Sequence, residues 1–114
     1  MRGQLWENLV FGELVKTHGL VPGRTLFFYR DQNGVEVDFL ADRGAEVVLI
    51  EAKAAELPDE RKLSIAMVAK LLAPRVRVHG VVACTTPERS PVRGEHVTWV
   101  NPLYAECLPT AACN

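Results

Sequence analysis

The sequence predicts an α/β domain with the element order α-β-β-β-α-β, a mixed sheet flanked by helices, and a short β-α appendix at its C-terminal end. Three observations predict this fold: a helical apolar pattern at the start, three strand-like runs separated by glycine turns, and a helical stretch followed by an apolar run. The last pair is typical of a parallel strand reached through a helical crossover. A chain of 114 residues suits one hydrophobic core, so we expect a single domain over residues 1–114.

The first helix is predicted from Gly3 to about His18, because Gly19 and a following Pro-Gly pair stop the pattern. Glu7 is unusual in this helix. Large apolar residues follow it three, four and seven positions later, so its carboxylate projects from the apolar face. Such an acid lies either at the rim of the core or in a functional site.

Three strands are predicted next, at Leu26–Arg30, Val35–Ala41 and Glu46–Lys53. The Asn33-Gly34 pair is the signal of a tight hairpin turn between the first two. The turn Asp42–Gly44 leads into the third. These elements are expected to form antiparallel pairs.

The second half of the chain predicts a helix from about Pro58 to Ala73, whose broad apolar stripe suits a helix covering a sheet. A buried, parallel strand follows at Val76–Cys84. A proline-rich loop then leads to a short strand at His96–Val100 and a closing helical turn or two at Pro102–Leu108.

Acidic side chains fall on the second and third strands. Simple alternation of strand side chains predicts two faces for the second strand, with Glu36, Asp38 and Leu40 on one and Val35, Val37 and Phe39 on the other. Glu51 and Lys53 share a face of the third strand. Asp38 and Glu51 are expected near the same end of the sheet, although the pattern does not fix the pairing register.

Composition limits the function classes. The formal net charge of −1 argues against a free-standing protein that binds DNA through its phosphates alone, and a modest basic cluster between Arg61 and Arg77 is interpreted as a solvated face. The three cysteines lack metal-ligand spacing and are interpreted as reduced thiols. The apolar runs are too short to cross a membrane and no signal peptide is recognisable, so we expect a cytoplasmic protein.

The pair of carboxylates and the lysine indicate a chemistry. Two neighbouring carboxylates repel one another unless a cation compensates them, and Mg²⁺ or Mn²⁺ is the natural oxygen-seeking partner. A lysine beside the metal can orient a water, and metal with activated water describes phosphodiester hydrolysis. The structural alternative is that Asp38, Glu51 and Lys53 form an ion pair at strand ends.

At these residues the sequence resembles the PD-(D/E)XK nuclease superfamily, whose restriction-endonuclease-like core has the same element order. The resemblance implies that Glu7, Asp38, Glu51 and Lys53 form the catalytic set, with Asp38, Glu51 and Glu7 as ligands of Mg²⁺ or Mn²⁺. Val37 replaces the proline of the superfamily motif. Arg30, Glu36 and Lys62 are further candidates, as site-organising or substrate-contacting residues.

The blocks "GQLWENLVFGELVK", "LFFYRDQNGVEVDFLAD" and "IEAK" also resemble the C-terminal domain, of unassigned function, of a family of prokaryotic AAA-type ATPases, over roughly residues 3 to 100. The resemblance implies an ATPase module in a parent chain as a partner, since no G-x-x-x-x-G-K-[ST] phosphate loop occurs here. DNA and a second copy of the chain are the other partners considered.

Two functions are therefore expected. The first is a metal-dependent phosphodiesterase, similar to a DNA endonuclease. The alternative is a non-catalytic module of the same fold that positions DNA or a partner protein for an AAA-type ATPase. The residues do not distinguish DNA from RNA as the substrate.

Overall fold

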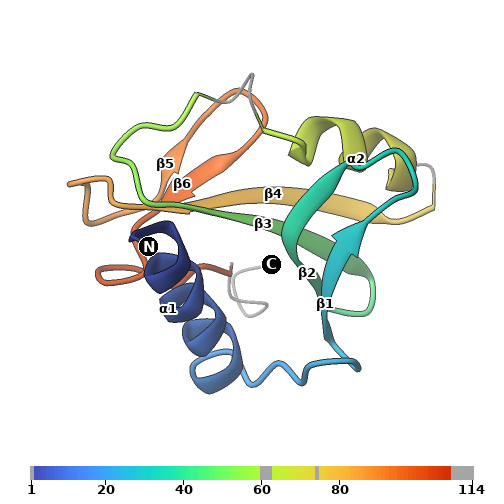
Figure 1. Ribbon diagram of the computed structural model, residues 1–114, viewed down its shortest axis with the longest axis horizontal. Coiled ribbons are helices and arrows are strands. Elements are labelled where there is room, and N and C mark those ends of the chain that lie inside the picture. The colour runs from blue at the N-terminus through green and yellow to red at the C-terminus, as the bar shows by residue number, and fades with distance from the viewer. Residues whose placement is uncertain (1, 60–62, 74, 109–114) are drawn as a thin grey trace.

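A computed structural model describes residues 2–59, 63–73 and 75–108. The chain forms a mixed sheet with one helix on each side (Figure 1). The elements, in chain order, are α1 (Arg2–Lys16), β1 (Leu26–Arg30), β2 (Glu36–Asp42), β3 (Glu46–Lys53), α2 (Ile65–Leu72), β4 (Arg77–Cys84), β5 (Val92–Arg93) and β6 (Thr98–Val100). The predicted order α-β-β-β-α-β is confirmed.

The sheet has the strand order β1-β2-β3-β4-β6-β5. The hairpins β1–β2 and β2–β3 are antiparallel, and β4 pairs with β3 in parallel after the crossover through α2. The short strand β6 is parallel to β4, and β5 is antiparallel to β6. The predicted mixed sheet flanked by helices is therefore confirmed.

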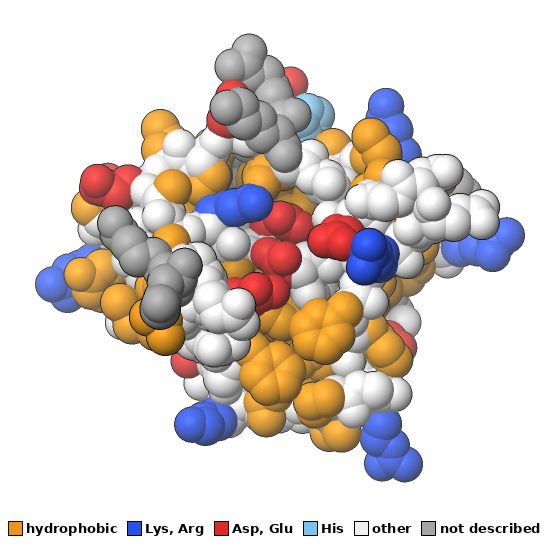
Figure 2. Space-filling view, viewed as in Figure 1, with side chains coloured by type: hydrophobic (Ala, Val, Ile, Leu, Met, Phe, Trp, Pro, Cys, Tyr) orange, Lys and Arg blue, Asp and Glu red, His pale blue; other side chains and the backbone are white. Residues whose placement is uncertain are grey.

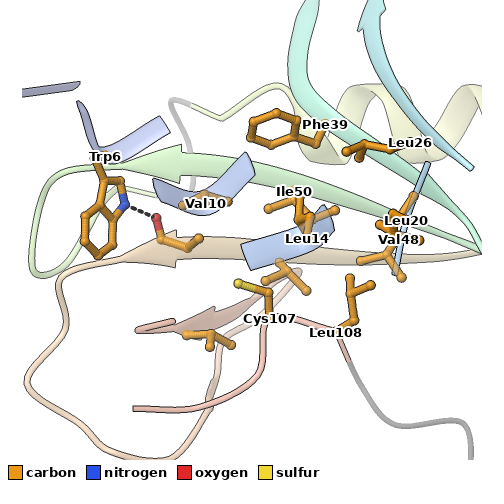
Figure 3. Packing of buried hydrophobic residues seen from close by; sticks show 14 residues of the cluster. Trp6, Val10, Leu14, Leu20, Leu26, Phe39, Val48, Ile50, Cys107 and Leu108 are labelled. Atoms are coloured by element: carbon orange, nitrogen blue, oxygen red, sulfur yellow. Dashed lines mark hydrogen bonds between the residues drawn. The ribbon is translucent and has the colours of Figure 1, made fainter. Parts of the chain in front are cut away.

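Helix α1 packs on one face of the sheet, chiefly against β3. Its residues Val10 and Leu14 are fully buried, and Figure 3 shows them in the cluster that also contains Ile50 of β3 and Cys107. The helix ends at Lys16, two residues before the predicted end. Gly19 follows with a φ of 66°, and the N–H of Leu20 donates to the carbonyl of Leu14 at 3.2 Å, which satisfies one of the free carbonyls at the helix end.

The indole of Trp6 fixes the N-terminal part of α1 on the sheet. Its Nε1–H donates to the carbonyl of Ala83 on β4 at 2.8 Å, in a buried environment (Figure 3). A buried indole N–H needs such a partner, because an unsatisfied donor away from water costs free energy. The contact sets the position of the neighbouring Glu7 relative to the strand ends.

The β1–β2 hairpin closes as the Asn-Gly signal predicts. Gly34 has a φ of 82°, and the carboxylate of Asp31 accepts the N–H groups of Asn33 at 2.9 Å and Val35 at 3.0 Å. A positive φ is readily available to glycine, and a carboxylate that caps the turn in this way stabilises it.

Strand β2 departs from simple alternation, which corrects the predicted faces. The register against β1 shifts between Phe27, which pairs with Leu40, and Tyr29, which pairs with Val37. Asp38 and Phe39 therefore both lie opposite Phe28, which is the geometry of a β-bulge. As a result Val37 packs in the core on the α2 side, whereas Phe39 packs in the core on the α1 side. The prediction that Val37 and Phe39 share a face was wrong.

Helix α2 packs on the opposite face, against β4 and β3. It begins at Ile65, with Ser64 as its N-cap residue, and Pro58 and Asp59 are not helical. The predicted start at Pro58 was wrong. Ile65 and Val68 of the helix are buried against the sheet, and Leu63, just before the helix, packs on the same cluster.

The C-terminal part differs from the predicted β-α appendix. Strand β5 occurs where a loop was expected, and residues 101–105 form a turn in which the N–H of Ala105 donates to the carbonyl of Asn101 at 3.0 Å. The predicted closing helix is thus a hydrogen-bonded turn in the described residues. None of the helices described here is long and apolar enough to span a membrane.

Candidate functional site

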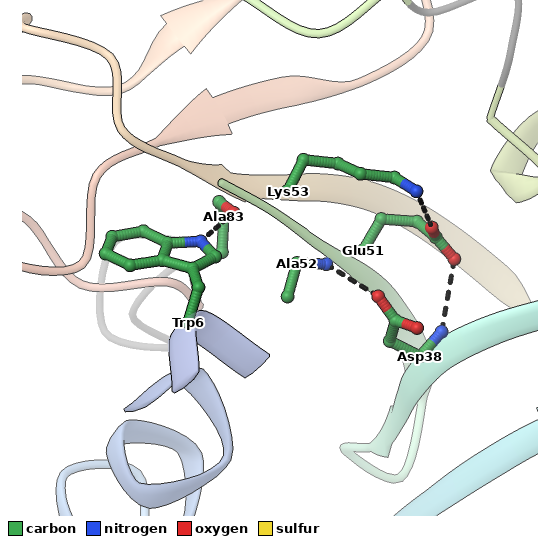
Figure 4. Close-up of polar contacts among 6 residues, drawn as sticks. All are labelled: Trp6, Asp38, Glu51, Ala52, Lys53 and Ala83. Carbon is green, nitrogen blue, oxygen red and sulfur yellow. Dashed lines mark hydrogen bonds and ion pairs between the residues drawn. The ribbon is translucent and has the colours of Figure 1, made fainter. Parts of the chain in front are cut away.

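Asp38 and Glu51 meet where β2 and β3 separate. The last backbone pair between these strands joins Phe39 and Ile50. Beyond this pair, side-chain carboxylates accept the backbone N–H groups in place of backbone carbonyls. The N–H of Asp38 donates to Glu51 Oε1 at 3.1 Å, and the N–H of Ala52 donates to Asp38 Oδ2 at 2.9 Å (Figure 4). Each carboxylate therefore binds the backbone of the opposite strand, and the two acids are held close together.

Lys53 completes this group. Its Nζ lies 3.6 Å from Glu51 Oε2, and Figure 4 shows the side chain reaching back over Glu51. The lysine side chain is 45% exposed, whereas that of Glu51 is 7% exposed. The ion pair is therefore asymmetric, with a buried anion and a cation in contact with water.

The pKa of Glu51 is raised from its ordinary value of 4.5 to about 7. Burial is the main cause, and the neighbouring Asp38 carboxylate adds to it. The hydrogen bond from the Asp38 backbone and the Lys53 ammonium act in the opposite direction but do not outweigh burial. Near neutral pH, Glu51 is thus present in both protonation states.

Glu7 faces this group from α1. Burial raises the pKa of Glu7, the Asp38 carboxylate raises it further, and the Lys53 ammonium lowers it. The carboxylate is thus within electrostatic range of both. Acidic side chains gather at the centre of the face shown in Figure 2, with a basic side chain beside them.

The carboxylates of the site can be compared with the ligands that Mg²⁺ or Mn²⁺ requires. Within the described ranges 2–59, 63–73 and 75–108, no three His, Cys, Asp or Glu side chains are close enough together to hold a metal ion. Asp38 and Glu51 still form a pair of oxygen donors. Because Mg²⁺ is commonly held by one or two carboxylates, with waters and substrate phosphate completing its shell, the pair fits that cation.

The three additional candidates have different positions. Arg30 and Glu36 form an ion pair next to the turn of the β1–β2 hairpin, with 3.2 Å between Nε and Oε1. Both side chains are largely exposed, so such a pair contributes little to stability. Lys62 lies outside the described residues.

Phe28 was not among the residues singled out from the sequence. Its side chain is 69% exposed, and its ring centroid lies 5.7 Å from that of Phe39, the neighbour of Asp38. The sequence signal was the pair Phe27-Phe28 in a strand, but alternation alone predicts that only one of the two is exposed. Both rings belong to the edge strand β1, and Phe27 is 37% exposed as well.

The fold and the site together define a small α/β domain whose carboxylate pair lies at the point where two antiparallel strands separate. The chain belongs to the family described as "Domain of unknown function (DUF4143)", which it matches over residues 2–105.

No curated protein matched the sequence. One solved structure is similar, a chain in the refined half-complex from the tetradecameric assembly of Thermococcus gammatolerans McrB AAA+ hexamers with bound McrC. The two chains share 19% sequence identity with a TM-score of 0.45, and the match covers 86% of this chain and 27% of that chain.

Proposed function

We propose that this domain is a phosphodiesterase that depends on Mg²⁺ or Mn²⁺ and acts on nucleic acid. The observation that carries the proposal is the burial of Glu51 beside Asp38, with Lys53 at the exposed edge of the pair. A fold gains no stability from bringing two carboxylates together in a poorly solvated place. A divalent cation would offset their repulsion.

The residues would divide the work as follows. Asp38 and Glu51 would hold the cation, which when bound supplies a Lewis acid and lowers the pKa of a coordinated water. Lys53, exposed and adjacent to Glu51, would orient the attacking water and neutralise charge that develops on the phosphate. Glu7 would act from α1 through a water, because the described acids form no three-ligand group.

Calorimetric titration with Mn²⁺ tests the metal assignment. Wild-type protein should bind the ion, and Asp38→Ala should not. Asp42→Asn is the matched control, since Asp42 is an exposed acid at the other end of the same strand and asparagine can still accept the N–H of Gly44. An unchanged isotherm in Asp38→Ala would exclude Asp38 as a ligand.

Cleavage assays test the activity itself. Labelled single-stranded and duplex DNA, and the corresponding RNA, should be cut by wild type in Mn²⁺ but not in chelator. The variants Asp38→Ala, Glu51→Gln and Lys53→Met should each lose most of this activity. Cleavage that persists in all three would belong to a contaminating nuclease.

A non-catalytic module is the second candidate, and one observation favours it. Both carboxylates already accept backbone N–H groups at the strand ends, so they also have a structural role that needs no metal. In this case the domain would position DNA or a partner protein for an ATPase module in a parent chain. Absence of Mn²⁺ binding together with normal folding would favour this function.

A further inference from the structure

Three phenylalanine rings form a row beside the acidic group. The ring centroids of Phe11 and Phe39 lie 6.1 Å apart, and those of Phe39 and Phe28 lie 5.7 Å apart. Phe39 directly follows Asp38 in the chain, and Phe11 follows Glu7 by one helical turn. In Figure 2, hydrophobic side chains border the central acidic group on one side. The aromatic row is thus continuous with the candidate site.

The row ends in an exposed aromatic ring. Phe39 is 1% exposed and forms the base of the row, whereas Phe28 is 69% exposed on the edge strand β1. The Phe28 ring packs at an interplanar angle of 44° against the buried Phe39 ring, and much of its surface contacts water. A supported, water-exposed ring is suited to stacking with a flat partner.

Charge around this ring favours a nucleic acid over an apolar protein surface. Arg30 and Phe28 are two residues apart on β1 and share a face of the strand. The Arg30 side chain is 76% exposed and pairs with Glu36 at the surface, where such an ion pair is weak enough to be exchanged for a phosphate. Lys53, which pairs with Glu51, is 45% exposed. The cores of protein interfaces are depleted in charge, whereas sites for single strands combine an aromatic ring with basic groups.

The net charge of the chain points in the same direction. At −1, contacts with phosphates cannot supply most of the affinity. Stacking of bases on an aromatic ring would have to contribute, and it requires an unpaired base, because bases in a duplex are covered by their neighbours.

We propose that Phe28 stacks an unpaired base next to the candidate site, so that the substrate is nucleic acid with a single-stranded segment and not continuous duplex. Arg30 would contact the adjacent phosphate. This inference rests on the proposed function, because it places the base next to the proposed catalytic group. It is tested by measuring binding, which requires no cleavage.

The test measures the anisotropy of a short fluorescein-labelled single-stranded DNA and of the corresponding duplex, both in chelator. Phe28→Leu is the main variant, because it keeps an apolar side chain against Phe39 and removes the aromatic face. We expect it to weaken single-strand binding by about 5- to 150-fold and to leave duplex binding unchanged. Phe28→Trp should retain tight binding. Met67→Ala, which removes a side chain of similar exposure (57%) on α2, is the control and should bind as wild type does.

Equal single-strand binding by wild type and Phe28→Leu, with thermal melts showing both folded, would overturn the proposal. The proposal would also be overturned if wild type bound duplex DNA as tightly as single-stranded DNA, or if it bound neither form. Self-association of wild type that Phe28→Leu abolishes, without DNA binding, would overturn it too and assign the ring to contact with a second copy. Single-strand binding that depends on Phe28, in a protein that cleaves nothing, would support this inference and exclude only the phosphodiesterase.

Discussion

At the scale of single residues, Glu51 is the side chain on which the site depends. It is an acid on a central strand, enclosed by protein, and the cation that pairs with it, Lys53, is 45% exposed. Its pKa of about 7 in the fold exceeds its ordinary value of 4.5. The folded state therefore binds the proton more tightly than the unfolded state does. This contribution to stability is fully present below about pH 4.5 and is lost as pH rises to about 7.

We predict that Glu51→Gln removes this dependence on pH. The glutamine oxygen can still accept the N–H of Asp38, but no charge is buried. At about pH 8 the variant should be more stable than wild type by about 1 to 3 kcal/mol, and at about pH 4 the two should be similar. Urea unfolding across this pH range measures the difference. Parallel stability curves for the two proteins would contradict the assigned pKa.

Lys53 permits a second prediction, which separates a functional lysine from a structural one. Since the ammonium is partly exposed, water screens its attraction to Glu51. Lys53→Met should therefore lower the free energy of unfolding by less than about 1 kcal/mol, while it removes cleavage. A loss of about 3 to 5 kcal/mol would instead indicate a buried structural ion pair, and urea denaturation at neutral pH distinguishes the two results.

Much of the site could be predicted from residue types. The sequence alone indicated Asp38, Glu51 and Lys53. Charged side chains inside apolar strands cost free energy when they are buried, and this cost indicates a functional role. Phe28 could not be selected in this way. Its contact with Phe39 depends on the bulge in β2, which arises from pairing between strands and leaves no local sequence signature.

At the scale of elements, local patterns predicted the strands and the crossover better than the helix boundaries. The second and third strands are correct to within a residue because their apolar runs end at turns with glycine, such as Gly34 and Gly44. The start of α2 was placed at Pro58 from a proline and acids typical of a first turn. Tertiary packing decides otherwise, since the helix begins where Ile65 can contact the sheet.

The contact between α2 and β4 gives a third prediction. A Cβ added to Gly80 would lie 2.6 Å from Ile65 Cγ2 and 3.1 Å from Val97 Cγ1. Gly80→Ala should therefore destabilise the fold by about 1 to 3 kcal/mol through overpacking. In the double variant with Ile65→Ala, the two losses should be less than additive, because the clashing methyl group is absent. Additive losses in chemical denaturation would show that the cost of Gly80→Ala comes from other neighbours, such as Val97, and not from Ile65.

At the scale of the whole molecule, the site joins elements from both hairpins and from α1, so a ligand bound there should stabilise the entire fold. We predict that Mn²⁺ raises the melting temperature of wild type in a concentration-dependent way, since it binds the native state preferentially. The rise should be larger at about pH 8 than at about pH 6, because the ion competes with the proton on Glu51. Glu51→Gln should show little rise, and an equal rise in both proteins would place the ion elsewhere.

The hydrogen bond from Trp6 to Ala83 has a consequence for how the molecule acquires its site. The two residues are 77 positions apart in sequence, and contacts between distant residues form only after a large loop has been closed. The acceptor carbonyl lies on β4, which itself must first pair with β3. Docking of α1 should therefore follow the transition state of folding, and Trp6→Phe should mainly accelerate unfolding in stopped-flow measurements. Glu7 would then be the last of the acids to reach its place, and a newly made chain would hold its strands in register before it could carry out any chemistry.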